Sequence, residues 1–100
     1  MNEIPRYASR MVQVLMELRG HLETSAASEW SAATPAEVMA LVDRQVTALL
    51  SDARLPERDS LRVLLLPTGD LQEIALDAGW GDAYLDLANR LDAELNAWPE

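Results

Sequence analysis

The stretch that decides the fold is LQEIALDAGWGDAYLDLANR, residues Leu71–Arg90, in which two helical segments meet at a glycine. Gly79 can adopt the left-handed backbone conformation that ends many helices, so it is expected to stop a helix capped by Asp70 and Glu73. The next helix is expected from Asp82 to about Trp98. Its apolar residues recur at three- and four-residue spacing, which predicts a buried stripe of Tyr84, Leu87, Ala88, Leu91, Leu95 and Trp98.

These two segments resemble a helix-turn-helix. The pattern of that motif has a small residue in the first helix, a glycine at the turn and an aliphatic residue in the second helix, and Ala75, Gly79 and Leu85 occupy these places. Alanine lets two helices approach closely, and glycine accepts the sharp turn. The remaining inward positions of the predicted motif are Ile74, Ala78 and Ala88.

DNA reading by this segment is not expected, because its second helix carries the wrong charge. A DNA-binding helix needs Lys or Arg to neutralise phosphates and donors that reach base edges. The second helix instead carries Asp82, Asp86 and, further on, Asp92, and its basic residue Arg90 lies at the far end. An architectural helix-turn-helix is therefore the prediction, and a transcription regulator is the alternative.

A second resemblance covers residues 64–92, less than a third of the chain. Its marks are Pro67-Thr68-Gly69, Leu71-Gln72-Glu73-Ile74, Gly79-Trp80 and Tyr84-Leu85. On these residues the segment resembles one found in small, uncharacterised bacterial all-helical proteins. The resemblance implies a bacterial origin, and it implies no particular activity because none is known for that family.

Three further helices are predicted upstream. The first covers residues 5–23, and its apolar stripe consists of Ile4, Tyr7, Met11, Leu15, Leu18 and Leu22. The second covers residues 35–51 and begins at a capping box. In this motif the side chains of Thr34 and Glu37 each accept a hydrogen bond from the backbone N–H of the other residue. A short third helix covers residues 56–66. Its residues 63–66 also have strand propensity, but the chain offers no partner strand, so a helix is predicted. The fold class is therefore predicted as all-α, a compact bundle of about five helices in a single domain, 1–100, with a helix-turn-helix-like C-terminal half.

The charge balance bounds the kind of partner. Seventeen acidic residues face eight arginines and no lysine, for a formal net charge of −9. Such a field repels nucleic acid and anionic membranes and attracts basic partners. No signal peptide and no membrane-spanning segment is expected, so a cytoplasmic location is predicted.

Catalytic and metal chemistry find little support in the residue types. The chain has no cysteine, and His21 is its single histidine, without a companion set for a zinc site or a general base. No nucleophile elbow and no glycine-rich phosphate loop is present. We therefore expect no enzyme, no metal and no cofactor, and a structural role for His21.

The clustered acids offer the best candidate site. Glu73 and Asp77 share one helix face at a spacing of four residues, as do Asp82 and Asp86 on the next helix. Such a face is either simply solvated or docks a basic protein. Glu29 and Trp30 form a second candidate patch. The expected function is non-enzymatic protein binding, exemplified by a bacterial immunity protein or antitoxin that neutralises a basic toxin; a homodimeric structural protein is a further alternative.

Overall fold

The computed structural model describes residues 4–26, 33–66 and 69–99, and every regular element in these ranges is a helix. The prediction of an all-α bundle of five helices is confirmed, and each predicted helix ends within two residues of the observed bounds. These bounds are α1 (Arg6–Glu23), α2 (Pro35–Asp52), α3 (Arg58–Leu64), α4 (Asp70–Ala78) and α5 (Gly81–Asn96). None of the described helices is long and apolar enough to cross a membrane.

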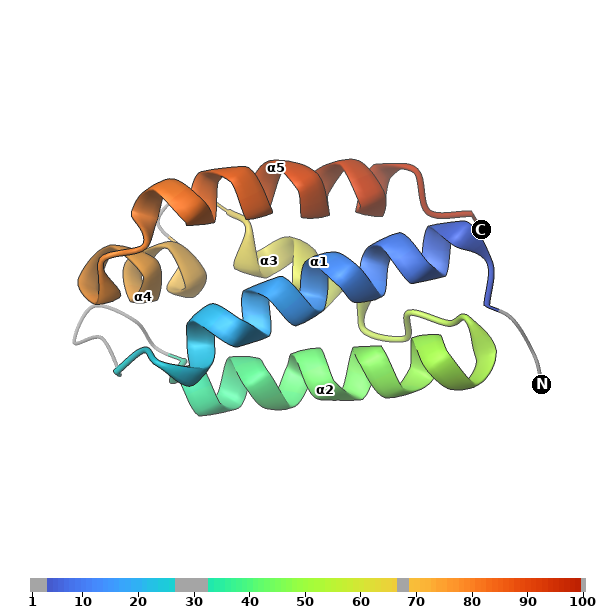
Figure 1. Cartoon of the computed structure of the whole chain (residues 1–100), viewed down its shortest axis with the longest axis horizontal. Coiled ribbons are helices and arrows are strands. Elements are labelled where there is room, and N and C mark those ends of the chain that lie inside the picture. The colour runs from blue at the N-terminus through green and yellow to red at the C-terminus, as the bar shows by residue number, and fades with distance from the viewer. Residues whose placement is uncertain (1–3, 27–32, 67–68, 100) are drawn as a thin grey trace.

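Helix α1 lies at the centre of the bundle. It packs between α2 and α5 and runs antiparallel to both, while the short helices α3 and α4 contact each other and α5 (Figure 1). The molecule is elongated, with extents of 43 × 21 × 20 Å. One end of it is formed by α4 and the start of α5 (Figure 1).

The central position of α1 explains how much of its apolar stripe is buried. Met11, Leu15, Leu18 and Leu22 are each at most 1% exposed, as the three- and four-residue spacing predicts. Ile4 and Tyr7 precede them and are only half-buried, although they pack against the core. The ring of Tyr7 meets that of Trp98 edge to face, with centroids 5.0 Å apart, and so ties the start of α1 to the end of α5.

The predicted capping box at the start of α2 is confirmed. The Glu37 backbone N–H donates to Thr34 Oγ1 over 3.2 Å, and the Thr34 backbone N–H donates to Glu37 Oε1 over 3.3 Å. The cap predicted for α4 is wrong. Gly69 occupies the N-cap position, Asp70 is the first helical residue, and no side chain caps the backbone there. Asp70 and Glu73 lie in the first turn of α4, where the helix dipole favours negative charge.

The turn between α4 and α5 matches the prediction for its backbone. Gly79 has a positive φ of 86°, and the backbone N–H groups of Gly79 and Trp80 donate to the carbonyls of Leu76 and Ala75. This pairing is the Schellman motif, in which the last carbonyls of a helix find donors beyond its end. Ala75 and Ile74 are fully buried beside the turn, as the helix-turn-helix pattern predicts.

The same pattern is wrong about two residues. Leu85 stands at its aliphatic position but is 61% exposed, and Ala78 is exposed as well. The buried face of α5 is centred on Tyr84, Leu87 and Leu91. Because each residue turns about 100° around a helix, Leu85 is rotated away from the face that Tyr84 occupies. Helices α4 and α5 thus form a helix-turn-helix in outline, with a leucine left on its outer side.

Candidate functional site

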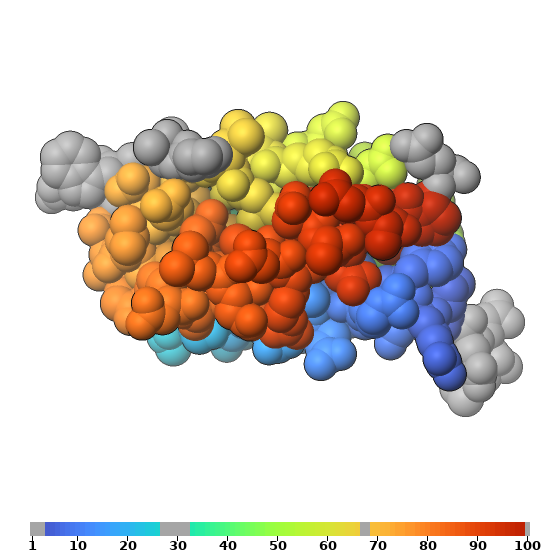
Figure 2. All heavy atoms as spheres, turned by 90° about the horizontal axis from the view of Figure 1, so that it is seen from above, coloured from blue at the N-terminus to red at the C-terminus, as the bar shows by residue number. Residues whose placement is uncertain are grey.

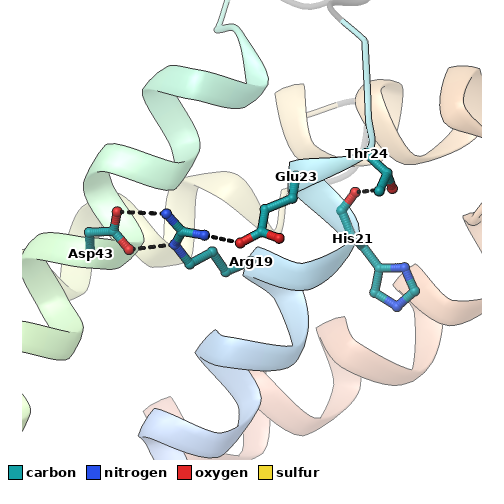
Figure 3. Close-up of polar contacts among 5 residues, drawn as sticks. All are labelled: Arg19, His21, Glu23, Thr24 and Asp43. Carbon is teal, nitrogen blue, oxygen red and sulfur yellow. Dashed lines mark hydrogen bonds and ion pairs between the residues drawn. The ribbon is translucent and has the colours of Figure 1, made fainter.

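Arginines join the long helices of the bundle through carboxylates. Arg19 of α1 lies between two acids, its own neighbour Glu23 and Asp43 of α2, and its Nε donates to Asp43 Oδ1 over 2.7 Å (Figure 3). The pKa of Arg19 is raised, first by this hydrogen bond to Asp43. The pair closes the solvent-facing edge of the contact between α1 and α2.

A similar arrangement joins α1 to α5. Arg90 Nη1 donates to Glu17 Oε1 over 3.0 Å, and Arg10 Nε donates to Glu94 over 3.2 Å. The hydrogen bond from Arg90 lowers the pKa of the Glu17 carboxyl. Two ion pairs therefore join α1 to α5, one in each direction between arginine and glutamate.

The connection from α2 to α3 is held by a buried glutamine. Gln45 is fully buried; its Oε1 accepts from the Glu57 backbone N–H over 3.0 Å, and its Nε2 donates to Glu57 Oε2 over 2.7 Å. Arg44 donates to both oxygens of the same carboxylate. These donors, Arg44 first, lower the pKa of Glu57. The buried polar atoms of this cluster all have hydrogen-bond partners. We therefore interpret it as a structural clamp between α2 and α3, and not as a reactive site.

The four acids predicted as a candidate site lie on α4 and on the first half of α5, toward one end of the molecule. We call Glu73, Asp77, Asp82 and Asp86 the acidic corner. They lie on the two helices that the Gly79-Trp80 turn joins, and the atoms of this region form the orange end of the space-filling view (Figure 2). Asp77, Asp82 and Asp86 are exposed and Glu73 is half-buried.

The acidic corner differs from the acids at the helix contacts, Glu17, Asp43, Glu57 and Glu94, in its lack of counter-charges. Asp86 has an exposed ion pair with Arg90 over 3.4 Å. Within the described residues, the side chains of Glu73, Asp77 and Asp82 make no hydrogen bond and no ion pair. Arg90 is shared with Glu17, which it contacts more closely. Three of the four carboxylates therefore have no counter-charge in the described part of the chain.

The helix dipoles favour some of these carboxylates and oppose another. Asp82 lies in the first turn of α5 and Glu73 in the first turn of α4, where negative charge is stabilised. Asp77 lies in the last turn of α4, which contains no basic residue and presents the negative end of the dipole. The spacing of four residues within each acid pair adds like-charge repulsion. The corner is thus retained at some cost to stability.

Two leucines lie beside these acids, and sequence reasoning did not include them in the site. Leu76 is 57% exposed and Leu85 is 61% exposed. The sequence could have indicated that Leu85 is exposed, because it follows Tyr84 by one residue and so lies off the predicted buried stripe of α5. Leu76 had no such signal, because its exposure depends on which face of a short helix meets α5.

Trp80 anchors the corner to the rest of the bundle. Its indole stacks on the His21 imidazole with ring centroids 4.8 Å apart and an interplanar angle of 17°. Its Nε1–H donates to Ser25 Oγ over 2.8 Å, and the Ser25 hydroxyl donates in turn to the His21 carbonyl at the end of α1. His21 therefore has a packing role, as predicted. These contacts tie the turn between α4 and α5 to the end of α1.

Comparison with protein-family models gives no match for this chain. Neither known proteins nor solved structures give a match. The resemblance of residues 64–92 to a bacterial segment therefore stays a prediction from the sequence.

The other candidate features carry less chemistry. Glu29 and Trp30, the second predicted patch, lie outside the described residues. No group of three or more acids and histidines within the described ranges could hold a metal ion. A surface hollow of about 320 Å³ is lined by residues 55–60, and one of about 220 Å³ between α1 and α5 is lined by Arg10, Arg90 and Glu94 among others. The charged groups of the second hollow are already paired with one another or with Glu17.

Proposed function

We propose that this protein is a non-enzymatic binding domain that presents its acidic corner to a basic surface of another protein. The single observation that supports this proposal is the contrast in pairing. Arginines form ion pairs with Glu17, Asp43, Glu57 and Glu94, whereas Glu73, Asp77 and Asp82 have no ion pair with any residue that the structure describes. In a chain of net charge −9, a patch left without counter-charges attracts a cationic surface.

Charge complementarity of this kind acts mainly on the encounter and on specificity. Steering by opposite charges raises association rates and disfavours partners of like charge. A bacterial immunity protein or antitoxin has this requirement, because it must find and mask the basic surface of a toxin. We propose that role as the biological setting, with a basic toxin as the partner.

We do not propose DNA binding for the α4–α5 region. The outward side of α5 bears Asp82, Leu85 and Asp86, and its arginine is engaged by Glu17. The phosphates of DNA repel such an anionic surface, and its exposed leucine offers them no hydrogen bond. A mobility-shift assay at low salt checks this choice, and a shift with genomic DNA would contradict it.

The experiment compares two double variants of equal charge. Asp77→Asn/Asp82→Asn removes two charges from the acidic corner, whereas Asp59→Asn/Asp92→Asn removes two exposed charges from α3 and from further along α5. Asp59 matches Asp82, because both lie in the first turn of a helix. The wild-type protein first captures its partner from the source organism, and the purified pair is then measured.

We expect the corner variant to bind at least about tenfold more weakly, which corresponds to ~1.4 kcal/mol, and the control variant to bind nearly as the wild type does. Raising the salt from about 0.1 M to 1 M shortens the Debye length from ~10 Å to ~3 Å and should weaken the wild-type complex. Equal weakening of both variants, or an affinity indifferent to salt, would refute the acidic corner as the docking surface.

A further inference from the structure

Leu76 and Leu85 give the acidic corner an apolar centre. A Cβ atom placed on Gly81 would lie 3.1 Å from Cδ2 of Leu76, so the Leu76 side chain leans over the Gly81 backbone. Leu85 follows Gly81 by four residues and therefore lies on the same side of α5, one turn further along. Helical side chains point back toward the preceding turn, which directs Leu85 toward Gly81 and Leu76. The two leucines thus form one row across the turn.

Asp82 and Asp86 form a second row beside the leucines. Asp82 follows Gly81 and Asp86 follows Leu85, while Asp77 follows Leu76 on α4. Each step of one residue turns about 100° around the helix, so Asp82 and Asp86 are displaced to the same side of the line from Gly81 to Leu85 on α5. On α5, Asp82 and Asp86 are about 6 Å apart at Cβ, the usual separation for a spacing of four residues.

We propose that the occupant of this surface is a cationic amphipathic helix, with aliphatic side chains on Leu76 and Leu85 and with Lys or Arg opposite Asp77, Asp82 and Asp86. This inference depends on the proposed function, and it specifies the partner's chemistry. A purely basic surface would leave the exposed leucines in water. A purely apolar one would desolvate unpaired carboxylates at a large cost. A helix with aliphatic residues at a spacing of four, flanked by cations at the same spacing, satisfies both rows.

The probe is a synthetic helical peptide with leucines at a spacing of four residues and arginines beside them. A second peptide of the same length has the leucines replaced by serine. Binding of each labelled peptide is measured by fluorescence anisotropy and calorimetry. Nuclear magnetic resonance shift changes identify the residues that are contacted.

The protein variants separate the two rows. Leu76→Ser/Leu85→Ser removes the apolar centre, and Met16→Ser/Leu50→Ser removes two comparably exposed apolar side chains from α1 and α2. Asp77→Asn/Asp82→Asn removes the charges. We expect the Leu76/Leu85 variant to bind the leucine peptide roughly tenfold or more weakly, with a less negative heat-capacity change and an unchanged salt dependence. The Met16/Leu50 variant should bind as the wild type does.

The outcomes are distinguishable. Wild-type affinity of the Leu76/Leu85 variant, with weakened binding by the Asp77/Asp82 variant, refutes the apolar centre and leaves the proposed function standing. Wild-type affinity of both variants refutes the inference and also the acidic corner as a docking surface. A wild-type dimer in light scattering that Leu76→Ser/Leu85→Ser converts to monomer would show that a second copy covers the leucines, and would overturn the cationic helix. Circular dichroism verifies that each variant keeps its fold.

Discussion

The contact between α1 and α5 and the corner where α4 meets α5 use the same residue types in opposite ways. In the first region, leucines such as Leu18 and Leu91 are buried and the acids Glu17 and Glu94 are paired with arginines. In the second region, two leucines are more than half exposed, and three acids have no counter-charge within residues 4–26, 33–66 and 69–99. Both regions include α5, so helix formation alone does not account for the difference.

Two different environments therefore exist along the single helix α5. Burial and ion pairing in the first region hold the bundle together, whereas the corner has exposed leucines and few counter-charges among the described residues. Sites that violate the rules of packing and charge are the ones to suspect of function. Four pairs of substitutions test this difference.

The same substitution at two positions of α5 gives the largest difference. Leu91→Ala removes a side chain that is 1% exposed and should lower the free energy of unfolding by about 2–5 kcal/mol. Leu85→Ala changes a side chain that is 61% exposed and should stay within about 0.5 kcal/mol of the wild type. Urea denaturation measures both. Similar losses at the two positions would show that Leu85 supports the fold, and the contrast between the regions would disappear.

Two glycines test whether the corner depends on its turn. Gly79→Ala introduces a side chain at a φ of 86° and should cost about 1–2 kcal/mol. Gly20→Ala lies within α1, where an added Cβ meets nothing within 4 Å, and should stabilise the protein by about 0.5–1 kcal/mol. Thermal unfolding of the two variants should therefore shift in opposite directions. A gain from Gly79→Ala would contradict the left-handed turn.

The pH dependence of stability tests the clamp at the α2–α3 connection. The Arg44 hydrogen bond lowers the pKa of Glu57 in the folded state, so its contribution is complete above the unfolded value of about 4.3 and is lost as the pH falls through the folded value. Glu57→Gln should be less stable than the wild type at neutral pH, and this difference should vanish in acid. Arg44→Gln should flatten the same acid limb, since it removes the cause of the shift. Parallel pH profiles of wild type and Glu57→Gln would contradict this assignment.

The smallest expected effect is a change in melting temperature that has opposite signs for two aspartate substitutions. Asp43→Asn removes the partner of Arg19 and should lower the melting temperature slightly. Asp77→Asn removes an unpaired charge from the last turn of α4, where the dipole disfavours it, and should raise the melting temperature slightly. Both effects should shrink in high salt. A loss of stability from Asp77→Asn would indicate that this carboxylate already has a favourable role in the fold.

Local chemistry made most of the fold predictable. The Thr34–Glu37 capping box, the left-handed glycine at Gly79 and the apolar stripe of α1 act between residues at most a few turns apart, so the sequence shows them directly. The four acids of the corner were predictable as a group for the same reason, since each pair lies on one helix. The cap assigned to Asp70 was wrong because the N-cap position lies one residue earlier, at Gly69, and Asp70 is the first helical residue.

By itself, the sequence determined the five helices, their ends and the excess of negative charge, because these follow from neighbouring residues and from composition. The tertiary structure alone decided which carboxylates meet arginines, which leucines stay outside and how Trp80 reaches Ser25 and His21. Those outcomes depend on the packing of helices separated by tens of residues. Helical periodicity specifies a face of one helix, but it does not specify which neighbour that face meets.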